Sequence, residues 1–256
     1  TSPSEAPTRI PPSRQVAGLL ALVTVFVAAG LGLQALRAGA APPASAAAAS
    51  AHPTDALTTP TPGPTPWAIP DVARTTVHRS GTPASGQFTS TTLGLEPALA
   101  AGTTNPYTLR VETTANVKAD AAARFVQQVL DDPRGWAGFG RNNFRLVADA
   151  GEARLVITIA SPDTTDALCG RRAATDGLWS CRVGGQVVLN SDRWHFMVPG
   201  YNNLDEYRAY LVNHHVGEFL GQRLAFCAEK GRPAPVMAQQ DRTLDGCLPN
   251  AWPKLT

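Results

Sequence analysis

Val212-Asn213-His214-His215-Val216-Gly217-Glu218-Phe219-Leu220-Gly221-Gln222-Arg223-Leu224 is the most informative stretch of the chain. It predicts the end of a helix that covers residues 204–220. Asn203, with Glu206 three residues later, is typical of a helix start, because the side chain at this position accepts hydrogen bonds from unpaired backbone N–H groups. Gly221 suits the left-handed conformation that commonly ends a helix. We therefore expect one long helix with His214 and Glu218 one turn apart.

The apolar residues of this helix occupy two of its faces. One stripe follows steps of four and three residues, and a second face is apolar throughout. The first stripe consists of Tyr207, Leu211, His214, Glu218 and Gly221, and the second face of Val212, Val216, Phe219 and Leu220. A helix that is apolar on two sides is expected to lie in the interior.

Burial makes the charge of Glu218 costly unless another group compensates it. The sequence offers three kinds of compensation, which are a metal ion, a protonated histidine, or an arginine such as Arg223. A hydrogen bond between His214 and Glu218 without any metal is the alternative that spacing alone leaves open.

The same stretch has the outline of the zinc-protease motif H-E-x-x-H-x-x-G-x-x-H. In that motif three histidines hold zinc and the glutamate handles the proton of a water molecule. His214 and Gly221 stand at matching positions. His215 replaces the glutamate, Glu218 replaces the second histidine, and Leu224 replaces the third. Only one of the three zinc ligands is therefore kept unchanged.

The charged residues are nearly balanced. Of the 22 basic and 20 acidic residues, three and two respectively precede Asp71, which leaves 19 basic and 18 acidic residues from there onward. The sequence has no basic stripe interleaved with aromatic residues, which is the pattern that nucleic-acid binding needs. We therefore expect no nucleic-acid partner.

The N-terminal part predicts a membrane anchor and a spacer. Residues 1–15 are polar and Pro-rich, and we expect a disordered cytoplasmic tail. Residues 16–36 carry no charge and are long enough to span the hydrocarbon layer as a single transmembrane helix, a signal-anchor. Residues 37–70 are rich in Ala, Pro and Thr and form an extracytoplasmic linker in this interpretation. The small residues at 44–46 leave a cleaved signal peptide as the alternative.

Residues 71–256 predict an α+β domain, because strand-like and helix-like segments alternate before the long final helix. Strands are expected at 72–77, 86–92, 107–112, 144–148, 155–159 and 186–190, with 155–159 in the centre of the sheet. A helix is expected at 118–130, and a loop at 163–181.

The four cysteines fall into two local pairs, Cys169/Cys181 and Cys227/Cys247. An even count in a chain that is exported favours disulfides. Each would stabilise the domain by about 3 kcal/mol in the chain-entropy model. A four-cysteine zinc site is the rival interpretation, but the sequence lacks a C-x-x-C pair.

Many short pieces of the chain, taken together in their order, resemble a family of secreted or membrane-anchored actinobacterial proteins with a metzincin-like domain. That family is catalogued largely as a domain of unknown function and is generally regarded as zinc peptidases. The resemblance covers residues 105–253 well and 71–104 loosely. The pieces that carry it are Cys169, Ser180-Cys181-Arg182, Val187-Val188-Leu189-Asn190, Arg193-Trp194, Tyr207-Arg208, Val212-Asn213-His214, Gly217, Gly221, Cys227, Ala234-Pro235-Val236-Met237, Gln240, Gly246-Cys247 and Pro249-Asn250-Ala251-Trp252-Pro253.

The resemblance implies a zincin fold with a mixed sheet, an active-site helix and a Met-turn at Met237. It also implies the pairings Cys169–Cys181 and Cys227–Cys247. Relatives carry N-H-E-V-G-H-x-L-G-x-x-H, and this chain departs from that pattern at His215, Glu218 and Leu224. His195, the nearest other histidine before the motif, has no position in it.

Catalytic zinc normally needs three protein ligands and an open water position. We therefore expect zinc to be absent or weakly bound, and a membrane-anchored, extracytoplasmic pseudopeptidase whose cleft binds peptide or cell-envelope material. The first alternative is an active, non-standard metallopeptidase in which His214 and Glu218 hold zinc and His215 is the general base. The second is a structural or interaction domain of the cell envelope.

Overall fold

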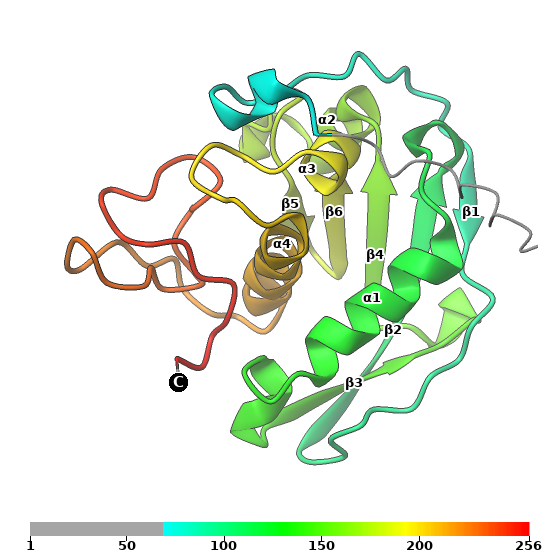
Figure 1. The fold of residues 1–256 in the computed structure, drawn as a ribbon. Coiled ribbons are helices and arrows are strands. Elements are labelled where there is room, and N and C mark those ends of the chain that lie inside the picture. Colours follow the sequence, from blue (N-terminus) through cyan, green and yellow to red (C-terminus); the bar gives the residue numbers. More distant parts are fainter. Residues whose placement is uncertain (1–68, 256) are drawn as a thin grey trace, which may run out of the picture. The chain divides into compact units, whose positions relative to one another are not determined.

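The apolar run Leu155–Ala160 forms strand β4, which lies at the centre of a six-stranded mixed sheet (Figure 1). The computed structural model describes residues 69–255 of the chain. The order across the sheet is β1-β2-β4-β6-β5, and β3 pairs with β2 as well. The other strands are β1 (Phe88–Ser90), β2 (Thr103–Glu112), β3 (Asn142–Leu146), β5 (Cys181–Val183) and β6 (Gln186–Asn190).

Three parallel and two antiparallel pairings give the sheet its mixed character. Strand β2 runs parallel to β3 and β4, and β4 runs parallel to β6. The short strands β1 and β5 are antiparallel to β2 and β6. The predicted α+β class with a mixed sheet, and the central place of residues 155–159, are therefore confirmed.

Two helices pack side by side on one face of this sheet, α1 (Ala119–Asp131) and α4 (Leu204–Phe219) (Figure 1). Successive side chains of a strand point to opposite faces. Leu155, Ile157 and Ile159 of β4 accordingly join the main core together with apolar residues of both helices. This burial is why α4 is apolar on two sides.

The opposite face of the sheet is covered by the short helix α2 (Pro162–Cys169) over a small second core. That core contains Ala160 and Val188 together with Cys169 and Cys181. Further along this face the side chains become polar. Arg110 Nε and Gln186 Nε2 each donate a hydrogen bond to Thr158 Oγ1 at 3.0 Å.

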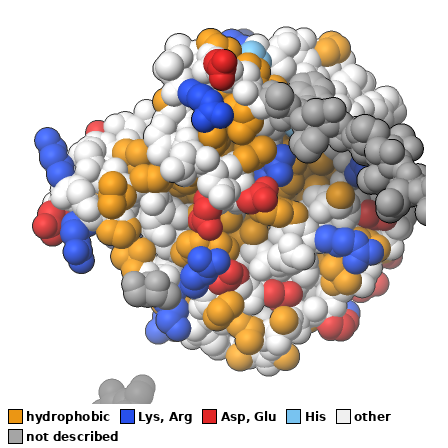
Figure 2. All heavy atoms as spheres, in the orientation of Figure 1, with side chains coloured by type: hydrophobic (Ala, Val, Ile, Leu, Met, Phe, Trp, Pro, Cys, Tyr) orange, Lys and Arg blue, Asp and Glu red, His pale blue; other side chains and the backbone are white. Residues whose placement is uncertain are grey.

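Both predicted disulfides are present and confirm the pairings that the resemblance implied. Cys169 is bonded to Cys181, and Cys227 to Cys247. The first joins the end of α2 to β5, and the second closes the C-terminal loops. Figure 2 shows acidic and basic side chains interspersed on the side of the molecule seen in Figure 1, with both kinds at the outer edge of the C-terminal loops.

Two sequence-based predictions were wrong. Residues 72–77 were expected to be a strand, but Asp71–Arg74 forms a 3-10 helix. Residues 163–181 were expected to be a loop, but α2 occupies their first part. Ser161 caps that helix and Pro162 takes its first position, where a missing N–H group costs nothing. The other short helices are α3 (Ser191–His195), Thr113–Ala115, Trp136–Phe139, Ala150–Glu152 and Arg171–Ala173.

Within residues 69–255, no helix is both long and apolar enough to cross a membrane. The predicted tail at 1–15, the predicted span at 16–36 and nearly all of the predicted linker at 37–70 lie outside the described residues.

Glu112, at the end of β2, joins three segments through its carboxylate. It accepts hydrogen bonds from the N–H groups of Ser85 and Gly86 at 2.6 and 2.8 Å, and from that of Ser161 at 2.7 Å. Thr164 Oγ1 donates a further bond at 2.8 Å. Burial alone would raise the pKa of Glu112, but these bonds outweigh it and lower the pKa to about 2.

We predict that Glu112→Gln destabilises the domain at pH 7 and has a much smaller effect near pH 3. A pKa of about 2, against 4.5 for an ordinary glutamate, corresponds to about 3 kcal/mol of stability. That contribution is complete above pH 4.5 and is lost as the pH falls toward 2. Denaturant unfolding at both pH values measures it. Asp163→Asn, an exposed acid in α2, is the control, and an equal loss at both pH values would refute the prediction.

Candidate functional site

Helix α4 begins and ends as its sequence predicts. Asn203 Oδ1 accepts hydrogen bonds from the N–H groups of Asp205 and Glu206 at 2.9 and 3.0 Å. At the other end, the N–H of Gly221 binds the carbonyl of Glu218 at 3.0 Å, and the N–H of Gln222 binds that of Gly217 at 2.9 Å. Gly221 has φ 79°. This double bonding pattern is the Schellman motif, and it turns the chain away from the helix axis.

Gly217 lets α4 approach two other segments closely. A side-chain Cβ at this position would come within 2.5 Å of Met237 Sδ and 2.6 Å of Trp136 Cζ2. The Trp136 ring is fixed, because its Nε1 donates a hydrogen bond to the carbonyl of Asn213 at 2.8 Å. The absence of a side chain at Gly217 therefore sets the distance between the helix and the Met237 turn.

Met237 is buried in a tight turn that follows the helix in sequence and packs against it in space. The N–H of Ala238 binds the carbonyl of Pro235 at 2.9 Å, and the carbonyl of Met237 accepts the N–H of Ala225 at 3.1 Å. Gln240 holds the end of this segment. Its Oε1 accepts the hydroxyl of Tyr201 at 2.8 Å, and its Nε2 donates to the carbonyl of Asn250 at 2.8 Å.

His214 is held in one tautomer by the turn. Its Nδ1 lies 2.9 Å from the carbonyl oxygen of Val236, which can only accept a hydrogen bond. Nδ1 is therefore the donor, and in the neutral ring Nε2 carries the lone pair. This orientation is the one by which proteins prepare a histidine to bind a metal. His214 Nε2 lies 3.9 Å from Glu218 Oε1.

His215 and Glu218 form a hydrogen-bonded pair beside His214. His215 Nδ1 lies 2.8 Å from Glu218 Oε2, and since a carboxylate accepts, Nδ1 donates. The rings of His214 and His215 are nearly perpendicular, at 83°. Adjacent residues of a helix diverge in direction, so these two histidines cannot reproduce the parallel pair that a spacing of four residues gives.

The electrostatics of the site favour a neutral His214 and an ionised Glu218. Burial, together with the neighbouring His215, lowers the pKa of His214. Burial by itself would raise the pKa of Glu218, but the hydrogen bond from His215, followed by smaller electrostatic effects of His215, His214 and, last, Arg182, outweighs it, so that the pKa is lowered. The resulting charge is compensated by a hydrogen bond and a nearby arginine.

The distances between the possible ligand atoms show whether His214, His215 and Glu218 could hold a zinc ion. His214, His215 and Glu218 each offer a ligand atom, and these atoms lie within 4.8 Å of one another. Two ligands of a tetrahedral zinc ion must lie about 3.3 Å apart. The distance between His215 Nδ1 and Glu218 Oε2 is shorter, at 2.8 Å, because the two atoms share a hydrogen bond. The distance between His214 Nε2 and Glu218 Oε1 is longer, at 3.9 Å. The donor set therefore does not fit zinc unless the hydrogen bond breaks and the side chains move.

The three side chains open into a pocket of about 160 Å³. Four separate segments build it, which are the loop after α2, the start of β5, α4, and the residues that follow the Met237 turn. Its other charged or aromatic lining residues are Trp179, Arg182, Asp241 and Arg242. Asp241 and Arg242 could not be identified from the sequence, because neither lies near the motif along the chain.

The remaining sequence-predicted residues lie elsewhere. Leu224, at the third ligand position, is 50% exposed and lines a different pocket, with Phe226. Arg223 is exposed beyond the helix end, and Arg182 is the arginine that acts on Glu218. His195 Nε2 lies 2.7 Å from the carbonyl oxygen of Ala115, and His195 is not among the residues that line the His214 pocket.

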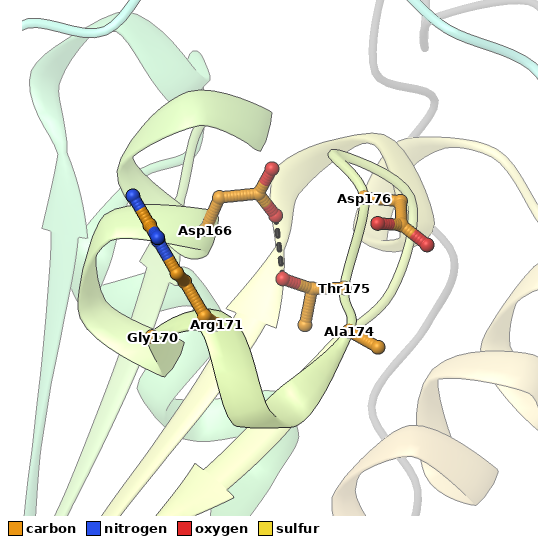
Figure 3. A pocket seen from close by; sticks show the side chains of 6 residues that line it. All are labelled: Asp166, Gly170, Arg171, Ala174, Thr175 and Asp176. Carbon is orange, nitrogen blue, oxygen red and sulfur yellow. Dashed lines mark hydrogen bonds between the residues drawn. The ribbon is translucent and has the colours of Figure 1, made fainter.

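A larger pocket of about 250 Å³ lies in the loop after α2 and contains none of the predicted site residues. Figure 3 shows its carboxylates, Asp166 and Asp176, pointing in different directions. Asp166 is engaged within the loop, because it accepts hydrogen bonds from Thr175 Oγ1 and, at 2.8 Å, from the N–H of Gly177. We assign this carboxylate to the structure of the loop rather than to a ligand.

Comparison with known proteins identifies the family and nothing closer. The model of the family described as "Protein of unknown function (DUF3152)" matches residues 79–249, and the chain therefore belongs to this family. No curated protein and no solved structure matches the chain. The prediction of a domain of unknown function is thereby confirmed, while the relationship to zincins stays a prediction.

We predict that Gly217→Ala lowers the free energy of unfolding by about 1–2 kcal/mol, although alanine is the better helix former. The added methyl group would overlap the fixed ring of Trp136. Denaturant unfolding measures the effect. Gly94→Ala is the control, because the nearest atom to its Cβ would be 3.8 Å away and we expect a change within about 0.5 kcal/mol. Equal effects of the two substitutions would refute the close approach.

Proposed function

We propose that this member of the DUF3152 family is a zincin-like binding domain that has lost the zinc-dependent chemistry of a peptidase. The observation that carries the proposal is the hydrogen bond of 2.8 Å between His215 and Glu218. These two residues stand where a zinc peptidase has its general base and its second zinc ligand. Here they bind each other. The third ligand position, Leu224, lies in another pocket.

Several features support a zincin-like architecture for the domain. A buried helix with His214 at the first ligand position is followed by a glycine-ended turn. A tight turn with Met237 then packs beneath the helix, against Gly217. The antiparallel strand β5 lies at the end of the sheet's main path and borders the pocket through Arg182. An edge strand beside a pocket is a geometry that binds extended peptides by adding a strand.

The proposed setting is the outer face of a cell membrane. The predicted span at residues 16–36 would hold the domain at the membrane, and the predicted linker at 37–70 would hold it away from the surface. The two disulfides suit an oxidising, extracytoplasmic compartment. In this setting we propose that the pocket binds a peptide or a component of the cell envelope.

A second candidate function is a non-standard metallopeptidase. It is favoured by the clustering of three potential ligand atoms within 4.8 Å. In that case His214 and Glu218 would hold zinc, and His215 would be released from Glu218 to act on a water molecule. The zinc would supply polarisation of that water and of the peptide carbonyl.

The experiment measures zinc content and peptide cleavage together. The full-length chain is purified in detergent, offered Zn²⁺, dialysed, and incubated with a mixture of unstructured labelled peptides. We expect far less than one zinc per chain, no cleavage, and peptide binding that persists in EDTA. His214→Ala and Glu218→Ala should leave the metal content unchanged.

One zinc per chain that both substitutions abolish, accompanied by peptide hydrolysis, would contradict the proposal and favour the metallopeptidase. Absence of both zinc and peptide binding would favour the purely structural or interaction domain.

A further inference from the structure

The pocket beside His214 contains two carboxylates and two guanidinium groups that do not pair with one another. Glu218 and Asp241 are the acids, and Arg182 and Arg242 are the bases. Among residues 69–255, no ion pair within 4.0 Å joins either acid to either arginine. Glu218 is engaged by His215, but the other three charged groups, which form no ion pair with one another, can act on a ligand.

Asp241 is the least compensated of the four groups. Its residue is only 9% exposed, yet in the described part of the chain its carboxylate accepts no hydrogen bond. Its oxygens are not among the enclosed polar atoms that lack a partner, so they face the solvent of the pocket. The fully buried guanidinium of Arg193 acts on Asp241 electrostatically, but the two do not form an ion pair within the described residues. Asp241 therefore has an open position for a cationic donor from the pocket.

The two arginines supply the positive charge of the pocket, and most of their N–H groups donate no hydrogen bond within the described residues. Arg182 Nη1 donates a hydrogen bond of 3.3 Å to the carbonyl of Gly184. Arg242 Nη2 donates one of 3.3 Å to the carbonyl of Ala174, and its guanidinium lies 5.4 Å from the centroid of the Trp179 ring. A guanidinium has five N–H donors in a planar fork that suits a carboxylate. Both arginines are exposed, so they stand at the mouth of the pocket.

From these groups we infer that the pocket binds a small zwitterion, namely a free α-amino acid or a short peptide with free ends, with the ammonium at Asp241 and the carboxylate at Arg182 and Arg242. The volume of about 160 Å³ accommodates a molecule of this size and not a folded partner. Each ligand charge meets an opposite charge that forms no ion pair within the described residues. The inference rests on the proposed function, because it names the ligand class of the same pocket.

Calorimetric titration of the full-length chain in detergent and EDTA tests the inference. The probes are L-alanyl-L-alanine, its N-acetyl derivative, which lacks the cation, and its C-terminal amide, which lacks the anion. We expect the free dipeptide to bind at least roughly tenfold more tightly than either derivative, because each loses a charge-assisted hydrogen bond. Equal affinities, or no measurable binding of the free dipeptide, would overturn the inference.

Substitutions assign each ligand charge to its protein partner. Asp241→Asn should abolish the preference for the free dipeptide over its N-acetyl form and leave the preference over the amide. The Tm of this variant is measured alongside, because Asp241 also acts electrostatically on the buried guanidinium of Arg193. Arg182→Met should reduce the preference over the amide only. The matched controls, Asp245→Asn and Arg171→Met, lie outside this pocket and should change neither preference.

If Asp241→Asn keeps the full preference for a free ammonium group, the assignment is wrong. The experiment is independent of the zinc measurement, because it is carried out in EDTA. A chain that proves to be a zinc peptidase but still discriminates the dipeptide from its derivatives would overturn the proposed function alone.

Discussion

The burial of α4 is the constraint on which the rest of the site depends. A helix enclosed by the sheet, α1 and the C-terminal loops must find hydrogen-bond partners for most of its polar side chains inside the domain, although Tyr207 Oη and Asn213 Oδ1 have none. Tyr210 Oη donates to the carbonyl of Ala238 at 3.0 Å, Asn213 Nδ2 to that of Ala251 at 2.9 Å, and His214 Nδ1 to that of Val236 at 2.9 Å. These bonds hold loops without regular secondary structure against the helix, so that the loops, and Asp241 with them, occupy fixed positions.

The same constraint explains how the departures from the zinc motif are accommodated. A carboxylate at position 218 in a buried helix would be costly alone, but His215 donates a hydrogen bond to it and Arg182 lies nearby. The altered residues thus form a satisfied pair that is compatible with the fold. His214 keeps the orientation of a metal ligand, because that orientation depends on Val236 and not on a metal.

The sequence predicted those parts of the fold that depend on local signals. The bounds of α4 follow from Asn203 and Gly221, and the central strand follows from the β-branched and apolar residues at 155–159. Helix α2 was missed because its few apolar residues show no clear period, and only Ser161 and Pro162 indicate its start. For Glu218, the hydrogen-bond partner is His215, which the zinc-motif comparison had considered only as a replacement for the general base. The chain turns at Gly221, and Arg223 is exposed beyond the helix end.

The pocket itself could not be predicted from the sequence, because four segments that are distant along the chain contribute to it. Asp241 follows the Met237 turn by only a few residues, yet its burial without a hydrogen bond becomes evident only when the loops are placed against α4. The disulfide pairing, in contrast, could be predicted, since the resemblance implied it and the two cysteines of each pair are close in sequence.

The central claim is that Glu218 is committed to His215 and not to a metal. Long-range ¹H–¹⁵N NMR of the imidazole rings in the full-length chain, recorded before and after addition of one equivalent of Zn²⁺, tests it directly. The account predicts a protonated Nδ1 and an unprotonated Nε2 in His214, and a protonated Nδ1 in His215 coupled to Glu218. It also predicts that none of these signals shifts with zinc. A zinc-dependent shift of His214 Nε2, together with loss of the His215–Glu218 hydrogen bond, would contradict it.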